Sequence, residues 1–260
     1  MNPPDVLPAA VVILADFCVS FIERTATGAV PPSDGHDVAA GQVAYYRRRA
    51  SEYDVTAYGD VDAARARITR VVAALRPAGN VLEIACGTGL WTSALAGVAS
   101  TVTAIDAAPE AVDIARGRVQ AANVRFEVAD VFCWAAAARF DTVFFAFWLS
   151  HVPASRFGQF WRQLRGLVTG HGRVLFVDEH PDACGKEAYA AGSDEIIQRR
   201  LGDGSEHRLV EVFVHPGQTS ARLHQLGWQG CIRRDGNDWV IGEARPANRS
   251  GRTPGTSKIQ

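Results

Sequence analysis

The stretch Val81–Trp91, with the sequence VLEIACGTGLW, constrains the fold more than any other part of the chain. Val81–Ala85 is a short apolar run that is typical of a buried parallel strand. Gly87 and Gly89 end this run, and Leu90–Val98 carries apolar residues on one helical face. A strand, a glycine turn and a helix in this order begin an open α/β sheet. Such sheets bind ligands beyond the carboxyl ends of their strands.

Two acidic residues follow the next two predicted strands and extend this pattern. Asp106 comes directly after the apolar run Thr101–Ile105, roughly 20 residues past the glycine turn, which suits an acid that accepts hydrogen bonds from both hydroxyls of a ribose. Asp130 follows the strand Arg125–Ala129 and can accept from an exocyclic amine such as that of adenine. Glycines in the turn let a ligand approach the backbone closely. Together these features predict a site for an adenosine-bearing ligand.

The chain resembles the class I S-adenosylmethionine-dependent methyltransferases over residues 42–244. The matching segments are Glu83–Gly89, Ala104–Ala107, Ala129–Val131, Phe140–Phe145 and Gly170–Phe176. The resemblance implies an α/β, doubly wound, Rossmann-like fold with a seven-stranded, mostly parallel sheet, a C-terminal antiparallel hairpin and an N-terminal helical cap. It also implies methyl transfer from S-adenosyl-L-methionine to oxygen or nitrogen of a small-molecule acceptor. Ala85 departs from the family pattern, which has glycine there, and we expect a slightly tighter loop without loss of binding.

The resemblance also implies where the cofactor binds. A helix predicted over Gln42–Tyr58 precedes the first strand, and Tyr46 or Tyr53 is expected to cap the methionine end of the cofactor. The alternative, given equal weight, is that these tyrosines anchor the helix by half-burying their rings. The predicted cofactor-binding residues are Tyr46, Tyr53, Glu83, Ala85, Gly87, Gly89, Asp106, Ala107, Asp130, Val131 and Ala146.

The segment after the predicted strand Thr142–Ala146 carries the candidates for chemistry. His151 is a possible general base because the unshifted pKa of histidine lies near neutrality, and its alternative role is to hydrogen-bond its own loop. Phe147 and Trp148 are predicted to form the wall of the acceptor site rather than to fill the core. His180, after the next strand, is a second candidate base, with a solvated strand end as the alternative.

Two other functions compete with this interpretation. A nicotinamide-dependent oxidoreductase also uses a glycine turn and a strand-end acid, but the third glycine of its motif would fall at Thr92. A protein that binds the cofactor without catalysis is the third possibility, and intact Asp106 and Asp130 argue against it. Nucleic acid is an unfavoured substrate because the net charge is −1, with no basic excess.

The composition limits which cellular compartment and which domain organisation are expected. The five cysteines include no Cys-x-x-Cys pair, which argues against a zinc site and favours a reducing, cytoplasmic location. No metal is predicted, although Asp178 and Glu179 leave a metal-assisted mechanism open. Residues 1–40 are predicted as an apolar segment and linker, 41–244 as the methyltransferase domain with a lid-like insertion at 182–215, and 245–260 as a disordered tail. Val6–Ile22 is apolar but short for a membrane span, so an amphipathic helix is expected.

Overall fold

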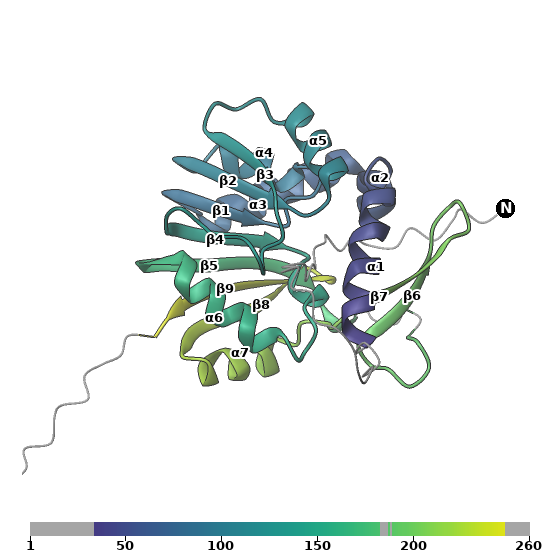
Figure 1. Cartoon of the computed structure of the whole chain (residues 1–260). Helices are drawn as coiled ribbons and strands as arrows, with labels where there is room; N and C mark the ends of the chain where they lie inside the picture. Colours follow the sequence, from purple (N-terminus) through teal and green to yellow (C-terminus); the bar gives the residue numbers. More distant parts are fainter. Residues whose placement is uncertain (1–33, 183–186, 188, 248–260) are drawn as a thin grey trace, which may run out of the picture.

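A seven-stranded sheet organises the part of the chain that the computed structural model describes, namely residues 34–182, 187 and 189–247 (Figure 1). The order of its strands is β3-β2-β1-β4-β5-β9-β8. The predicted apolar segment Val6–Ile22 and the predicted tail from residue 248 onward lie outside the described residues. No helix within the described ranges is long and apolar enough to cross a membrane.

The first five strands run parallel, and the last two form an antiparallel hairpin at one edge of the sheet. The strand bounds are β1 (Asn80–Ile84), β2 (Thr101–Asp106), β3 (Val124–Val128), β4 (Phe140–Ala146), β5 (Val168–Glu179), β8 (Trp228–Asp235) and β9 (Trp239–Pro246). The predicted doubly wound sheet with a C-terminal hairpin is therefore confirmed. β9 runs to Pro246, which lies inside the stretch predicted as tail.

Helices cover both faces of the sheet, and aromatic side chains fill the space between the sheet and α6. The helices of this layer are α3 (Val61–Leu75), α4 (Leu90–Ala96), α5 (Pro109–Arg118), α6 (Phe157–Leu167) and α7 (Pro216–Gln225), with a short 3₁₀ turn η1 (Leu149–His151). Phe145 of β4 stacks on Phe176 of β5 at 5.4 Å between ring centroids and meets Phe160 of α6 at 5.5 Å. Burial of such rings is the main stabilising contribution here.

Two helices form the N-terminal cap, α1 (Asp34–Arg49) and α2 (Tyr53–Tyr58). The single helix predicted over residues 42–58 was wrong, because a turn closed by the Glu52 N–H and the Arg49 carbonyl (3.0 Å) separates the two helices. α1 also begins inside the stretch predicted as a linker. Val38 and Gln42 are buried on it, so packing overrides the weak helix propensity of its glycines.

A two-stranded arm, β6 (Ile196–Arg200) with β7 (Glu206–Val210), projects from the region predicted as a lid-like insertion. α1 stands between this arm and the main sheet (Figure 1). Gln42 Oε1 accepts a hydrogen bond from the Val210 N–H at 2.9 Å, which ties the arm to the cap. The cap therefore contacts the edge where the parallel strands end and the arm on its other side.

Candidate functional site

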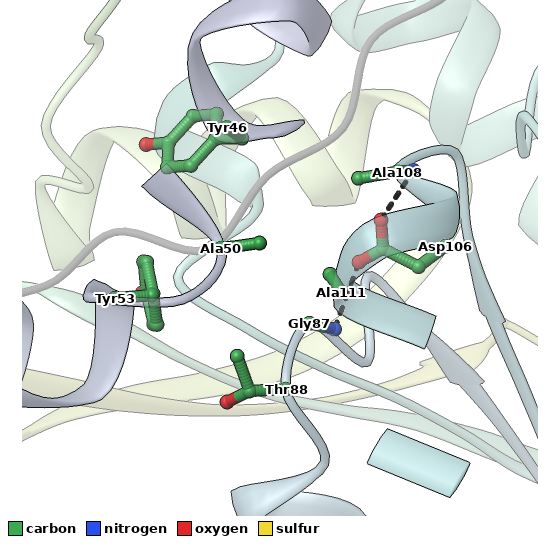
Figure 2. Close-up of a pocket in the computed structure, with 8 residues that line it drawn as sticks. All are labelled: Tyr46, Ala50, Tyr53, Gly87, Thr88, Asp106, Ala108 and Ala111. Atoms are coloured by element: carbon green, nitrogen blue, oxygen red, sulfur yellow. Dashed lines mark hydrogen bonds between the residues drawn. The ribbon is translucent and has the colours of Figure 1, made fainter. Parts of the chain in front are cut away.

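A cavity lies between the cap and the carboxyl ends of β1 and β2 (Figure 2). Its lining residues are Tyr46, Ala50, Tyr53, Gly87, Thr88, Asp106, Ala108 and Ala111. This is the edge at which open α/β sheets bind ligands. The cap supplies one wall of the cavity, and the loops that follow β1 and β2 supply the other.

Asp106 ends β2 and is only 1% exposed. Its two carboxylate oxygens accept hydrogen bonds from the backbone N–H groups of Gly87 and Ala108, each at 2.8 Å (Figure 2). Burial raises the pKa of Asp106 to about 7, although these two N–H groups oppose the rise. The carboxylate thus joins the loop after β1 to the loop after β2, and it changes charge close to neutral pH.

The glycine loop adopts left-handed backbone conformations at several positions. Gly87 has φ 53° and Gly89 has φ 84°, and a Cβ on Gly89 would lie 2.9 Å from the Cβ of Ala115. Both positions therefore need glycine. Ala85 has φ 63°, a conformation that costs a non-glycine residue roughly 1–2 kcal/mol. The departure from the family pattern at Ala85 consequently stores strain in the loop.

Polar contacts hold the cap over the cavity. Thr88 Oγ1 donates to Asp54 Oδ1 of α2 at 2.5 Å, and Asp54 also pairs with Arg118 of α5. On the surface, Arg47 of α1 forms an ion pair with Glu110 of α5 at 2.8 Å. The cap is thereby fastened both to the glycine loop and to the helix that follows Asp106.

His151 connects the cap to the arm and is fully buried. Its Nδ1–H donates to the Val210 carbonyl at 2.7 Å, so its Nε2 accepts from the Tyr46 hydroxyl at 3.1 Å. Burial lowers the pKa of His151 to about 3, although the Val210 carbonyl opposes this, so the imidazole is neutral at pH 7. The Tyr46 hydroxyl points away from Asp106 (Figure 2). Tyr46 therefore stands between His151 and the cavity.

Of the predicted cofactor-binding residues, the structure brings Tyr46, Tyr53, Gly87 and Asp106 together on the cavity. The ones that do not line it are Glu83, Ala85, Gly89, Ala107, Asp130, Val131 and Ala146. Within this second group, burial raises the pKa of Glu83 in β1 to about 8, and Asp130 Oδ1 accepts from the Phe132 N–H at 2.9 Å.

Sequence reasoning missed four lining residues, Ala50, Thr88, Ala108 and Ala111. Thr88 stands between the two predicted glycines, and Ala108 is the N-cap of the helix that follows Asp106. Their positions beside a glycine turn and beside a strand-end acid were the available signals. Ala50 had none, because it depends on the break between α1 and α2.

The remaining candidates occupy different surroundings. Phe147 is buried with φ 53° and lines a second cavity of about 580 Å³ together with Tyr58 and Trp239. Trp148 packs instead in the core, 5.8 Å from Phe160 between ring centroids. His180 Nδ1 accepts from the Asp182 N–H at 3.1 Å, and His180 lines neither cavity. Among the described residues, no three His, Cys, Asp or Glu side chains are grouped so that they could hold a metal ion.

Comparison with known proteins gives consistent matches. Residues 81–172 match the family described as a methyltransferase domain. The ubiquinone biosynthesis O-methyltransferase of Xanthomonas axonopodis pv. citri (strain 306) is 34% identical over 168 residues, which cover 63% of this chain and 68% of that protein.

Two solved structures extend the comparison. A complex of DhpI with S-adenosylhomocysteine is 37% identical and superposes with a TM-score of 0.73, over 82% of this chain and 99% of that chain. The 1,6-didemethyltoxoflavin-N1-methyltransferase of Burkholderia thailandensis has a TM-score of 0.58 at 19% identity, over 85% of this chain and 94% of its own, which is a likeness of fold.

Proposed function

Because this chain belongs to the class I S-adenosylmethionine-dependent methyltransferases, we propose that the cavity under its cap holds the cofactor and that Asp106 binds the cofactor's ribose. The enzyme transfers a methyl group from S-adenosyl-L-methionine to a small-molecule acceptor. The observation that carries the proposed placement is the buried carboxylate of Asp106 on the cavity wall, beside the glycine turn.

The residues present fit such a ligand. Gly87 places no side chain on the cavity wall, and Asp106 offers acceptor oxygens to ribose hydroxyls. The hydroxyl of Tyr53 is buried without a hydrogen-bond partner among the described residues, so it is free to bond a ligand. When bound, S-adenosylmethionine supplies a methyl group on a sulfonium that is already reactive. The protein contributes alignment and exclusion of water, which can supply roughly 7–11 kcal/mol.

A hydroxyl or ammonium acceptor must also lose a proton, and we assign this step to Tyr46 backed by His151. The Tyr46 oxygen takes the acceptor's proton while its own proton passes to Nε2 of His151. The Val210 carbonyl holds the proton on Nδ1, which keeps Nε2 free to accept. Because burial disfavours the charged imidazole, a hydroxyl loses its proton together with the methyl transfer, whereas an ammonium must lose its proton first to free the lone pair that attacks. His151 is a positioning residue in this scheme.

The choice between oxygen and nitrogen rests on relatives of both kinds. One similar protein is named an O-methyltransferase and one structure of the same fold is named an N1-methyltransferase, so either acceptor atom is compatible with the site. The predicted alternative of a nicotinamide oxidoreductase is not supported. We further propose residues 41–244 as the catalytic domain and a cytoplasmic location, the latter from the scattered cysteines.

Calorimetric titration with S-adenosylhomocysteine and with NAD tests the assignment of the cavity, and a mass-spectrometric acceptor screen with labelled cofactor supplies the turnover assay.

His151→Asn keeps a donor for the Val210 carbonyl and removes the Nε2 acceptor, while Tyr46→Phe removes only the hydroxyl. We expect each change to lower kcat by about 10²–10⁴-fold, and the double variant to lose little more because the two residues act as a unit. His171→Ala, at an exposed position, is the control. Loss of S-adenosylhomocysteine binding in His151→Asn, with the fold intact, would contradict this role.

A further inference from the structure

A second group of buried polar side chains lies beyond Tyr46, where β5 ends and the arm meets the cap. Asp178 and Glu179 end β5, Arg199 lies in β6, and Glu211 follows β7, and all four are buried. Glu211 Oε2 is 4.0 Å from Nδ1 of His151, so this group begins directly behind the pair formed by Tyr46 and His151. It therefore adjoins the wall of the cofactor cavity without belonging to it.

Most of these charges are satisfied within the group. Arg199 pairs with Glu187 at 2.5 Å and with Glu211 Oε2 at 3.1 Å, and Asp178 accepts from the backbone N–H groups of Ser150 and Glu179. In contrast, Glu179 Oε1 and Glu211 Oε1 have no hydrogen-bond partner among the described residues. Glu179 is only 2% exposed, so solvent does not replace the missing donors.

Strand alternation fixes the direction in which Glu179 points. The ring of Phe176 packs on Trp161 of α6 at 6.0 Å, so Phe176 faces that helix, and Glu179, three residues on, faces the opposite side of the sheet. On that side it lies close enough to Tyr58 of α2 to help burial raise the pKa of this phenol. Tyr58 in turn contacts Phe147 at 6.3 Å. Glu179 thus points under the cap, towards Tyr58 and the residue that follows β4, Phe147.

A buried carboxylate without donors is an unfavourable arrangement for the protein alone. Burial raises the pKa of Glu179, and the neighbouring Glu211 raises it further, while Arg199 only partly opposes them. Arg199 makes its ion pairs with Glu187 and Glu211, and Oε1 of Glu179 has no hydrogen-bond partner among the described residues. An unmet buried acceptor destabilises the folded protein, and a ligand that brings donors removes this cost.

We propose that Glu179, assisted by Glu211, binds a protonated amine of the methyl acceptor, and that the acceptors of this enzyme are therefore small cationic amines. The inference rests on the proposed methyl transfer and adds the substrate class. An ammonium group supplies three donors, enough for the open oxygens of both glutamates, and its charge is favoured between two acids. A carboxylate or phosphate on the acceptor would bring its own negative charge and further acceptor oxygens to two buried acids, and be rejected.

Matched probes test this proposal on the full-length protein saturated with S-adenosylhomocysteine. The first set is tyramine, 4-ethylphenol and 3-(4-hydroxyphenyl)propionate, and the second is ethanolamine, ethylene glycol and glycolate. Calorimetry gives the affinities, and labelled cofactor reports methylation of the same compounds. We expect the amine of at least one set to bind about tenfold or more tightly than its carboxylate counterpart.

The variant Glu179→Gln keeps the shape of the side chain and removes its charge. It should abolish the preference for the amine and leave the Kd for S-adenosylhomocysteine within about twofold. It should melt at the same or a higher temperature, because Oε1 of the native carboxylate has no donor. A glutamate with only a structural role would instead lower the melting temperature when replaced. Glu206→Gln, at an exposed position on β7, is the control and should keep the preference.

The outcomes separate the two proposals. If the wild-type protein does not bind S-adenosylhomocysteine, the proposed cofactor site fails. If it does bind, three results overturn the amine proposal alone: equal or tighter binding of the carboxylates, no binding of either amine, or a preference that survives in Glu179→Gln.

Discussion

Protonation of Asp106 is expected to weaken cofactor binding below neutral pH. Burial raises the pKa of this carboxyl to about 7 in the free protein. In the proposed complex, ribose hydroxyls donate to the ionised carboxylate, so binding favours the charged form and lowers the pKa. Above pH 7 the acceptor is already present and affinity is flat. As pH falls below 7, each bound ligand must displace a proton, and affinity falls by up to about tenfold per pH unit.

The size of the effect follows from the distance between the assay pH and that pKa. At about pH 5.5, which is roughly 1.5 units below the pKa, the Kd should be about 30-fold higher than on the plateau, or about 2 kcal/mol. Asp106→Asn should remove this pH dependence. It also removes two charge-assisted bonds worth roughly 1.5–3 kcal/mol each, so at every pH its Kd should lie about 10²–10⁴-fold above the wild-type plateau value.

Calorimetry with S-adenosylhomocysteine and with adenosine, between about pH 5.5 and 8.5, measures both effects. Adenosine isolates the ribose contacts, because it lacks the amino and carboxyl groups of the longer ligand. The control Asp113→Asn changes an acid on α5 whose side chain is 73% exposed, and it should behave as wild type. A wild-type Kd that stays flat across this range, or an Asp106→Asn protein with unchanged affinity, would refute the reasoning.

Two further predictions concern stability and are checked by thermal or denaturant unfolding. Within the glycine loop, Ala85→Gly should stabilise the protein by up to about 1 kcal/mol by relieving its left-handed backbone. Gly89→Ala should destabilise it by about 1–3 kcal/mol. Gly117→Ala is the control, because a Cβ at that position meets nothing within 4 Å. Arg199→Met should lower the free energy of unfolding by about 3–5 kcal/mol, because it leaves buried glutamates without their cation. An Arg199→Met protein as stable as the wild type would count against the ion-pair argument. Equal effects of Gly89→Ala and Gly117→Ala would count against the argument about the loop.

The sheet could be predicted from the sequence because its signals are local. An apolar run, a glycine turn and a strand-end acid lie within a few residues of one another around Gly87, and again around Asp106. Strand order and the placement of both groups on one cavity follow from the right-handed crossovers of parallel strands. Sequence reasoning therefore identified the loop residues that line the cavity, or identified residues directly adjacent to them.

The cap and the surroundings of His151 could not be predicted in this way. The tautomer of His151 depends on the Val210 carbonyl, 59 residues further along the chain, and its burial depends on the arm. α1 extends over a stretch of weak helix formers because Gln42 is held by that same arm. Similarly, Phe147 and Trp148 are adjacent aromatic residues, but only Phe147 reaches a cavity, because η1 begins directly after Trp148 and turns the chain. Such contacts arise from tertiary packing and leave no local pattern.

The cap that covers Asp106 affects the rate at which the enzyme can turn over. Because Asp106 is only 1% exposed, we expect that a nucleoside bound there as proposed leaves when α1 and α2 move away from the cavity. That movement breaks the contact of Thr88 with Asp54 and the surface ion pair of Arg47 with Glu110. We therefore expect departure of the demethylated product to limit turnover. Because the ion pair of Arg47 with Glu110 is exposed to solvent, added salt should weaken it and raise the turnover rate.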